Sequence, residues 1–485
     1  MAVPPTAPRS ALRRLLPLLA GVAAMAALVA RFGGGTADRL FEIVLGGPQT
    51  EEIRALPKGH WNPVRPAGPG SSDPGGPAPE GPEGPSAEER ARLVSLPYLG
   101  GRAAAEEAAG VGGRGVTRLD AEAVAPGANL YNSGHGPEAI LLDPEGRVLH
   151  RWRYPFERAF PGVTPTSDTH FFRRVRLLPG GRLAALYQTG GLVFLDRRSR
   201  LLGRCRGNFY NDFWLEGGPG EGPSEGPNGA GRIWTIAKEL RSGSAGSARA
   251  GGAGRLDDFL VELRADPDGG TCREVRRISI TGAFRGSPFA DLLALRAPSG
   301  DVLHTNTVEE LGGPIPGAPA GFAPGNLLIS LREIDVVAVV DPEARRVVWA
   351  RHGPWDAQHE PSPLDGGALL LFDNLGNGGG NPGGSAPRPR GGRARVLEVH
   401  PGSGEVLWSW TGDPPGTLSS DLAGSCARLP NGNTLVTESV PGRAYEIDPE
   451  GRVVWEFRSP HRAGPDDSLV AMLFEVQRVP WRPER

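Results

Sequence analysis

RAYEIDPEGRVVWEF, residues 443–457, contains two apolar runs joined by an Asp-Pro-Glu-Gly turn. Short apolar runs on either side of such turn residues predict a β-hairpin. Five related units occur elsewhere in the chain. They are AILLDPEGRVLHRW (139–152), LVFLDRRSRLLGRC (192–205), FLVELRADPDGGTCREV (259–275), VAVVDPEARRVVWA (337–350) and RVLEVHPGSGEVLWSW (395–410). The chain is therefore organised around six copies of one hairpin.

A second unit, a glycine-bearing turn followed by an apolar strand, alternates with the first. It occurs as LLPGGRLAAL (177–186), GRIWTI (231–236), APGNLLIS (323–330), LDGGALLLF (364–372) and LPNGNTLVT (429–437). The two units give about four strands per repeat, and radial repetition of four-stranded sheets is the propeller architecture. We predict an all-β fold, a six-bladed β-propeller over residues 126–485. The first copy has no preceding partner, so N-terminal and C-terminal strands should pair to close the ring.

Tryptophans end several of the predicted strands, at Trp152, Trp349, Trp408 and Trp455. Their large apolar rings favour packing between blades over a ligand-binding role.

The composition is consistent with this architecture and excludes some functions. The 485 residues include 72 Gly and 49 Pro, which favour turns and short strands over helices. Lys+Arg (53) and Asp+Glu (55) almost balance, so no nucleic-acid partner is expected. The three cysteines, Cys205, Cys272 and Cys426, allow one disulfide and lack zinc-ligand spacing. We expect no cofactor and no metal.

The N-terminal quarter of the chain has a different character. Residues 15–30 form an uncharged apolar run that follows Arg9, Arg13 and Arg14, which is typical of a signal peptide or membrane anchor. We predict a signal anchor or signal peptide over 1–32, slightly favour an uncleaved transmembrane anchor, and expect the rest of the chain to be exported to the periplasmic or extracellular side. A juxtamembrane segment (33–60), a disordered Pro/Gly-rich linker (61–86) and a short helical lead-in (87–125) should follow.

One group of polar residues has the chemistry to hold a small tetrahedral oxyanion. His304, Asn306, Arg332 and His359 combine fixed hydrogen-bond donors, a permanent cation and imidazoles of adjustable charge. Structural roles remain open for each of them: Arg332 has Glu333 and Asp335 beside it, and Asn306 suits a turn. A metal site made by the two histidines lacks a further ligand.

Three segments carry a resemblance to a known family. DVLHTNTVEEL (301–311), the stretch from Asn326 to Asn374, and GSCARLPNGNTLVTES with GRAYEIDPEGRVVWEF (424–457) resemble the arylsulfotransferases, which are exported bacterial six-bladed propellers. The most specific part is an ordered set: His-x-Asn, an arginine after the next strand, and Gln-His ahead of a Leu-Phe-Asp-Asn strand. The resemblance covers roughly residue 127 to the C-terminus.

The resemblance implies a nucleotide-independent aryl-sulfate sulfotransferase, which moves a sulfuryl group from an aryl sulfate to a phenol through a sulfated histidine. His359 matches the nucleophile, and His304, Asn306 and Arg332 match the groups around the sulfuryl oxygens. One departure is visible. The family's His-His-Asp element aligns with Asn208–Asp212, which keeps only the aspartate. His170 is the candidate to replace the missing histidine, and Tyr210 and Asn211 are expected near the substrate.

A second hypothesis belongs to a different class. A non-catalytic propeller could bind a ligand or protein partner at the same axial opening. The altered Asn208–Asp212 element favours this reading, whereas retention of the four matched residues favours the enzyme. The expected partners are a small aryl sulfate and a phenol, with the membrane reached through the N-terminal helix.

Overall fold

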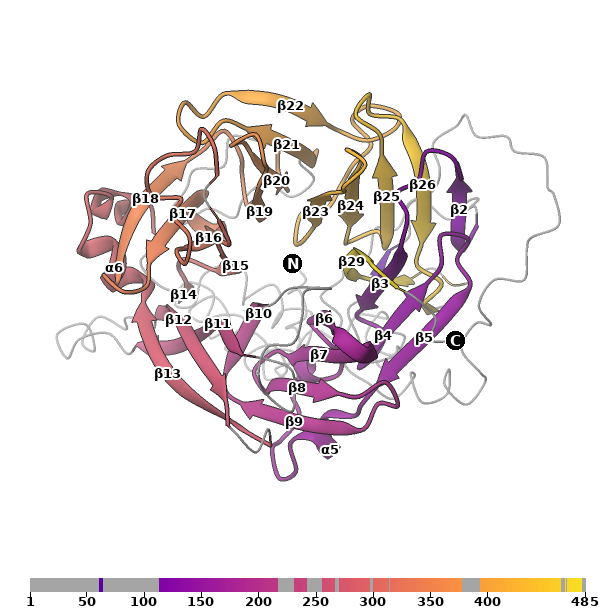
Figure 1. Ribbon diagram of the computed structural model, residues 1–485, viewed down its shortest axis with the longest axis horizontal. Helices are drawn as coiled ribbons and strands as arrows, with labels where there is room; N and C mark the ends of the chain where they lie inside the picture. The colour runs from indigo at the N-terminus through magenta and orange to yellow at the C-terminus, as the bar shows by residue number, and fades with distance from the viewer. Residues whose placement is uncertain are drawn as a thin grey trace, which may run out of the picture.

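Six β-sheets are arranged radially around a central axis in the computed structural model (Figure 1). The structure describes residues 61–63, 113–216, 231–241, 255–266, 270–296, 300–313, 315–376, 393–463, 467 and 469–481. Each of the six sheets is a blade whose first strand lies nearest the axis and whose last strand lies at the rim. The predicted all-β six-bladed propeller is confirmed.

Blades 1 to 3 follow one another in chain order, apart from the first strand of blade 1. Blade 1 contains β29 (Leu473–Val479), β3 (Ala128–Ser133), β4 (Glu138–Leu142) and β5 (Val148–Arg153). Blade 2 contains β6 (Arg174–Leu178), β7 (Arg182–Tyr187), β8 (Gly191–Leu195) and β9 (Leu201–Arg206). Blade 3 contains β10 (Phe209–Leu215), β11 (Arg232–Arg241), β12 (Arg255–Ala265) and β13 (Cys272–Ser279), and β14 (Gly300–Asp301) pairs with β12.

Blades 4 to 6 complete the ring. Blade 4 contains β15 (Thr305–Glu310), β16 (Leu327–Leu331), β17 (Val336–Asp341) and β18 (Arg346–His352). Blade 5 contains β19 (His359–Pro363), β20 (Leu369–Asp373), β21 (Arg395–Val399) and β22 (Val406–Trp410). Blade 6 contains β23 (Ser425–Arg428), β24 (Thr434–Glu438), β25 (Arg443–Ile447), β26 (Val453–Arg458) and, at its outer edge, β2 (Gly115–Leu119).

The remaining described elements are short. The α-helices are α5 (Phe156–Ala159) and α6 (Ile280–Arg285). The 3-10 turns are η1 (Ser167–Thr169), η2 (Pro179–Gly181), η4 (Ala290–Leu295) and η5 (Arg332–Ile334). A small separate sheet joins β1 (Trp61–Pro63), β28 (Leu469–Ala471) and β27 (Arg462–Ala463).

The repeated aspartate turns fix the hairpin between the two outer strands of a blade. In the turn that starts at Asp143, the carboxylate accepts hydrogen bonds from the backbone N–H and the Nε of Arg147, both at 2.7 Å. The same pairing recurs between Asp196 and Arg200 and between Asp448 and Arg452. An aspartate four residues before an arginine thus satisfies the turn's backbone, which explains why this spacing repeats along the chain.

The hydrophobic core lies between the blades rather than at the centre of the disc. Six apolar clusters fill the six spaces between neighbouring sheets. Because both faces of a middle strand are covered, these strands are almost entirely apolar, as in β16 and β17. Trp152, Trp349 and Trp455 are buried members of these clusters, and Trp408 packs on one from the rim. The predicted packing role of the tryptophans is confirmed.

The two ends of the propeller sequence pair with each other to close the ring. β29, near the C-terminus, is the inner strand of blade 1 and pairs antiparallel with β3. β2 pairs antiparallel with β26 of blade 6. The predicted closure by terminal strands is therefore confirmed. Blade 6 also includes residues upstream of the boundary predicted at 126, because β2 supplies its fifth strand.

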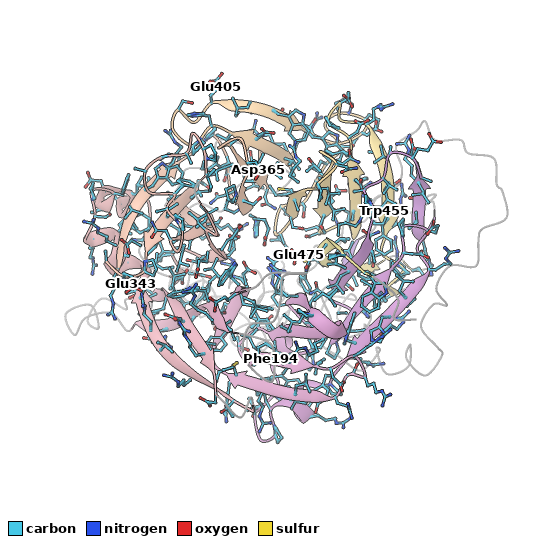
Figure 2. All side chains as sticks on the ribbon, viewed as in Figure 1. Phe194, Glu343, Asp365, Glu405, Trp455 and Glu475 are labelled. Carbon is cyan, nitrogen blue, oxygen red and sulfur yellow. A yellow bond between two sulfur atoms is a disulfide. The ribbon has the colours of Figure 1, made fainter. Side chains whose placement is uncertain are left out.

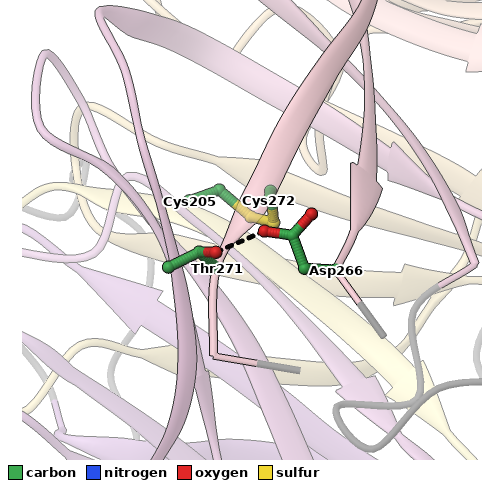
Figure 3. Close-up of a disulfide and its surroundings, with 4 residues drawn as sticks. All are labelled: Cys205, Asp266, Thr271 and Cys272. Carbon is green, nitrogen blue, oxygen red and sulfur yellow. Dashed lines mark hydrogen bonds between the residues drawn. A yellow bond between two sulfur atoms is a disulfide. The ribbon is translucent and has the colours of Figure 1, made fainter. Parts of the chain in front are cut away.

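A disulfide between Cys205 and Cys272 links the outer strands of blades 2 and 3 (Figure 3). Their Cα atoms are 4.9 Å apart, and Cys426 is a buried free thiol. Beside this link the Thr271 hydroxyl donates a hydrogen bond to the Asp266 carboxylate. Of the three cysteines, one pair is joined across two blades.

The N-terminal predictions fall largely outside the described residues. This applies to the segments 1–32 and 33–60, and to most of 61–86 and 87–125. Two corrections can be made. Residues 61–63, at the start of the predicted linker, form β1 by pairing with β28. Residues 115–119, in the predicted helical lead-in, form β2, because the exposed edge of blade 6 offers them a backbone hydrogen-bonding partner. Within the described ranges, no helix has the length and apolarity to cross a membrane.

Candidate active site at the top face of the propeller

All the predicted site residues belong to one face of the disc, which we call the top face: the face at which the inner strands begin. His304 precedes β15, Asn306 lies near its start, and His359 is the first residue of β19. Arg332 opens η5, the turn between β16 and β17. Because antiparallel strands alternate in direction, this turn lies at the same end of its blade as the start of β15. The topology thus brings residues from two blades to one place.

His359 is almost fully buried, with 4% of its surface exposed, and its imidazole is held at one nitrogen. Nδ1 lies 2.7 Å from Oδ1 of Asn374 and 3.2 Å from the carbonyl oxygen of Ala357. The Asn374 amide is itself oriented, because its Nδ2 donates to the carbonyls of Ser420 and Ala423. Both partners of Nδ1 are therefore acceptors, so Nδ1 carries the proton and Nε2 presents a lone pair.

The surroundings of His359 favour its neutral form. Burial lowers its pKa well below the ordinary value, and the positive charges of Arg332 and Arg173 lower it further. The hydrogen bond that His359 donates to Asn374 opposes this effect, and the charge of His304 adds to the lowering. At neutral pH the side chain is thus an uncharged imidazole within electrostatic reach of two arginines and a second histidine.

Arg332 is mostly buried, and its guanidinium already has partners. Nη1 forms an ion pair with Glu333, and Nη2 donates to the carbonyl of Asp421 at 3.1 Å. The structural alternative considered for this residue, pairing with Glu333, is therefore present. Its charge still influences His359 across the site.

His304 belongs to a chain of charged groups. Its backbone is left-handed (φ 49°), and Nδ1 lies 2.7 Å from Oδ2 of Asp301. The same carboxylate forms an ion pair with Lys238. His304 and Lys238 together hold the pKa of Asp301 well below its usual range despite burial. An ionised Asp301 fixes Nδ1 of His304 as a donor and leaves Nε2 as the free ring nitrogen.

Asn306 connects the two strands that carry the histidines. Nδ2 donates to the carbonyl of Gln358 at 2.8 Å, and Oδ1 accepts from the Thr307 hydroxyl at 3.2 Å. The pairing of β15 with β16 shifts register at Asn306, as expected for a bulge. Its buried amide thus fixes the residue that immediately precedes His359.

Of the three remaining predicted residues, His170 lies in the connection that leads into blade 2, and Tyr210 and Asn211 lie near the start of β10, the inner strand of blade 3. His170 ends η1, ahead of β6. Asn211 has a left-handed backbone (φ 58°) and donates from Nδ2 to the carbonyl of Thr305 at 2.9 Å, so it supports the start of β15. The Tyr210 ring lies 5.3 Å from Nζ of Lys238.

A buried cluster of charges, not predicted from the sequence, lies next to this site. Arg174 is 3% exposed, and its guanidinium lies 3.0 Å from Asp212 and 2.8 Å from Glu475 and forms an ion pair with Glu360. Arg176 also reaches Glu475, at 2.7 Å. These residues come from the inner strands of four blades, and Glu475 lies near the centre of the ring in Figure 2. The cluster therefore lies near the centre of the ring, between the inner strands.

Arg173, Asp301 and Asn374 were also not assigned roles from the sequence. The run Phe171-Phe172-Arg173-Arg174 offered only a partial signal, because two successive arginines stand at the start of a strand but the sequence does not show which blades Arg174 meets. Asn374 ends the Leu-Phe-Asp-Asn segment of the resemblance, and Asp301 lies three residues before His304. Only the fold shows that these positions lie beside the histidines.

Two further observations concern binding sites. Among the described residues, no group of three or more His, Cys, Asp or Glu could hold a metal ion. A cavity of about 680 Å³ lies at the outer edge of the disc, between β2, the β25–β26 turn and Asp413. It contains none of the candidate-site residues described above.

Comparison with known proteins supports the same family. Residues 279–460 match the model of the arylsulfotransferase (ASST) family. No curated protein matches the chain.

Among solved structures, a protein of unknown function from Bacteroides caccae is 11% identical, with a TM-score of 0.39, and 73% of this chain and 98% of that chain are covered. A streptogramin B lyase is 13% identical, with a TM-score of 0.36 and coverages of 75% and 93%. The β-propeller domain of Myceliophteria thermophila Cps50 (Swd1) is 12% identical, with a TM-score of 0.38 and coverages of 76% and 98%. The family match over residues 279–460, together with the six-bladed ring, supports an arylsulfotransferase-type propeller.

Proposed function

We propose that the protein transfers a sulfuryl group from an aryl sulfate to a phenol through a sulfated His359. The observation that carries the proposal is the state of His359: a buried, neutral imidazole whose Nδ1–H is committed to Asn374 and Ala357. A free Nε2 lone pair, shielded from bulk water, is what a nitrogen nucleophile requires.

The first half-reaction exchanges one bond to sulfur for another. Nε2 of His359 forms a bond to sulfur, the bond from sulfur to the aryl oxygen breaks, and its electron pair leaves with the phenolate. In the second half-reaction an acceptor phenol oxygen attacks the sulfur, and the N–S electron pair returns to Nε2. The charge on the equatorial sulfuryl oxygens is stabilised by nearby cations, Arg332 among them.

His304 is suited to transfer the protons that these steps require. Asp301 holds its Nδ1, so an imidazolium His304 can give its Nε2 proton to the leaving phenolate, and the neutral Nε2 that results can accept the proton of the incoming phenol. Asn306 acts one step away from the chemistry: through the Gln358 carbonyl it fixes the strand start that carries His359.

A binding function without catalysis is the second candidate. It is favoured by the ion pair between Arg332 and Glu333, which partly neutralises the cation, and by the absence of histidine from Asn208–Asp212.

We also propose that the propeller is exported and held at the membrane by residues 15–30. The disulfide between Cys205 and Cys272 supports an oxidising compartment, and Arg9, Arg13 and Arg14 support an N-terminus that stays in the cytoplasm. Protease added to spheroplasts should digest the propeller, and full protection of the propeller would contradict this orientation.

The test of the catalytic proposal is a turnover assay on the purified protein. A chromogenic aryl sulfate and a phenol acceptor are incubated with wild type, His359→Asn and, as a surface control, His400→Asn, since His400 lies on an exposed turn. We expect release of the donor phenol with wild type and the control, and none with His359→Asn. If wild type releases no phenol across donors and pH but retains the aryl sulfate, the binding function is correct instead.

A further inference from the structure

Arg173 is a cation at the top face that forms no ion pair with any described residue. It directly precedes β6, and its backbone N–H donates to the carbonyl of Leu186 at 2.8 Å, which fixes the main chain. Cζ lies 4.9 Å from the centroid of the Phe474 ring. Within the described ranges the guanidinium makes neither an ion pair nor a side-chain hydrogen bond, so its donors remain available.

The acidic groups whose charges act on Arg173 already have other partners. Asp212 and Glu360 both contact Arg174, and Asp168 accepts a hydrogen bond from Nε2 of Gln188 at 3.2 Å. A partly buried guanidinium without a counter-charge is costly, and such a group is expected where an anion binds. Burial and the neighbouring Arg174 lower the pKa of Arg173 to about 10, so it remains charged at neutral pH.

The fold places Arg173 beside the candidate nucleophile. Arg174 and Glu360 form an ion pair, and Arg173 and His359 are the residues immediately before them in the chain. Arg173 directly precedes β6 and His359 is the first residue of β19, so both lie at the start of an inner strand. A second route connects them: Phe474 packs in one apolar cluster with Ala423, whose carbonyl accepts from the Asn374 amide that holds His359. The charge of Arg173 also acts on His359.

Arg332 alone is poorly placed to supply all the positive charge, because Glu333 pairs with its charge and one N–H of each terminal nitrogen is already used, by Glu333 and by the Asp421 carbonyl. Asn208–Asp212 contributes no histidine. We propose that Arg173 is an anion-binding residue of the active site, which donates hydrogen bonds to the sulfuryl oxygens of the donor and of the sulfated His359. This inference rests on the proposed function for the identity of the anion. Arg173, ahead of β6 in blade 2, thus takes the role of the histidine that is missing from Asn208–Asp212 in blade 3.

Binding of inorganic sulfate is the direct test, because it requires no turnover. Isothermal titration of the full-length protein would compare wild type, Arg173→Gln, Arg173→Lys and Arg158→Gln. Arg158 is a matched control, since it is an exposed arginine stacked 5.5 Å from the Tyr154 ring. Losing a charged hydrogen-bond donor should weaken sulfate binding by about 10- to 100-fold in Arg173→Gln. Arg173→Lys should fall between this variant and wild type, and the control should match wild type.

The outcomes separate this inference from the proposed transfer reaction. If wild type binds sulfate but releases no phenol, the transfer proposal fails while the assignment of Arg173 stands on the binding data. If Arg173→Gln binds sulfate as wild type does, or if wild type binds none, the assignment is overturned. Should Arg173→Gln fail to fold by its thermal melt, Arg173→Lys decides: affinity equal to wild type would reject a role for the guanidinium's paired donors.

An active wild type permits a second readout. Arg173→Gln should lower kcat by about 10²-fold, because the charge on the sulfuryl oxygens is greatest when sulfur is being transferred. A purely structural role would instead reduce the amount of folded enzyme and leave kcat per folded molecule unchanged.

Discussion

Arg174 and Glu360 form an ion pair across the propeller axis, between the inner strands of blades 2 and 5, which face each other in the ring. Asp212 and Glu475 bring blades 3 and 1 to the same guanidinium. The pair thus ties opposite sides of the disc together directly beside His359.

Replacing Arg174 with methionine should strongly destabilise the propeller. The substitution leaves buried carboxylates without their cation, which typically costs about 3–5 kcal/mol of unfolding free energy. Denaturant unfolding measures this cost. The double variant Arg174→Met/Glu360→Gln should recover part of the lost unfolding free energy, because it removes the Glu360 carboxylate, one of the buried charges left without a cation. A loss below about 1 kcal/mol in the single variant would show that the cluster does not stabilise the ring.

Asn374 should matter through the proton it keeps on Nδ1 of His359. Asn374→Leu removes that acceptor, so we expect kcat to fall by about 10²-fold or more with little change in stability beyond the lost hydrogen bonds. Asn374→Asp restores an acceptor, but its charge should raise the pKa of His359 and move the acid limb of the pH–rate profile upward. Equal profiles for wild type and Asn374→Asp would contradict the assigned tautomer.

The pH dependence of transfer follows from the lowered pKa of His359. A free imidazole gains its proton near pH 6.5. Burial and Arg332 keep His359 neutral to a lower pH, so activity should remain flat below 6.5 and decline only as pH falls through the lowered value. Arg332→Gln removes one of these charges and should shift the decline toward higher pH. A wild-type profile that already falls by half at pH 6.5 would be inconsistent with this environment.

Glu309 should make the unfolding free energy of the protein decrease as pH rises. Burial, together with the charges of Glu360 and Asp212, raises its pKa to about 8, whereas the unfolded chain would titrate at its ordinary, much lower value. Between these values the folded state binds the extra proton, so its stability falls as pH rises.

Glu309→Gln should therefore be more stable than wild type at pH 8.5, by on the order of 1–3 kcal/mol, and nearly equal to it at pH 4. Glu405→Gln, on the exposed rim, is the control. If Glu309→Gln were as much more stable than wild type at pH 4 as it is at pH 8.5, titration of Glu309 would be excluded as the cause.

The disulfide should contribute measurable stability. Cys205 and Cys272 are separated by 67 residues, and closing a loop of that size in the unfolded chain is worth about 4 kcal/mol by chain entropy. The double Cys→Ser variant should thus lose about 2–4 kcal/mol in unfolding free energy. Thiol counting on wild type under denaturing conditions should detect one free cysteine, Cys426. Three free thiols would contradict the pairing.

The sequence predicted the ring well because its signals are local and repeated. A turn such as Asp448–Arg452 satisfies its own backbone, so each hairpin can be recognised without knowing its neighbours. The closure by terminal strands could also be inferred, because the first copy lacked a partner. The edge strand β2 could not, since its pairing depends on an exposed edge that exists only after blade 6 has formed.

The site was predicted less completely, for a physical reason. His304, Arg332 and His359 could be named from their residue types and spacing. Arg173 and Arg174 could not, because their importance arises from blades that meet only around the axis. Likewise, the Asn306 amide proved to hold the Gln358 backbone, a contact across two blades that spacing along the chain does not reveal.

The most direct test of the central claim, that His359 is the nucleophile, is mass spectrometry of the protein after incubation with an aryl sulfate and no acceptor. We predict the addition of one SO₃ group to wild type, mapped to the peptide that contains His359 and removed when a phenol is supplied. The His359→Asn variant should remain unmodified. Phenol release by wild type without any adduct, or an adduct that persists in His359→Asn, would contradict the account.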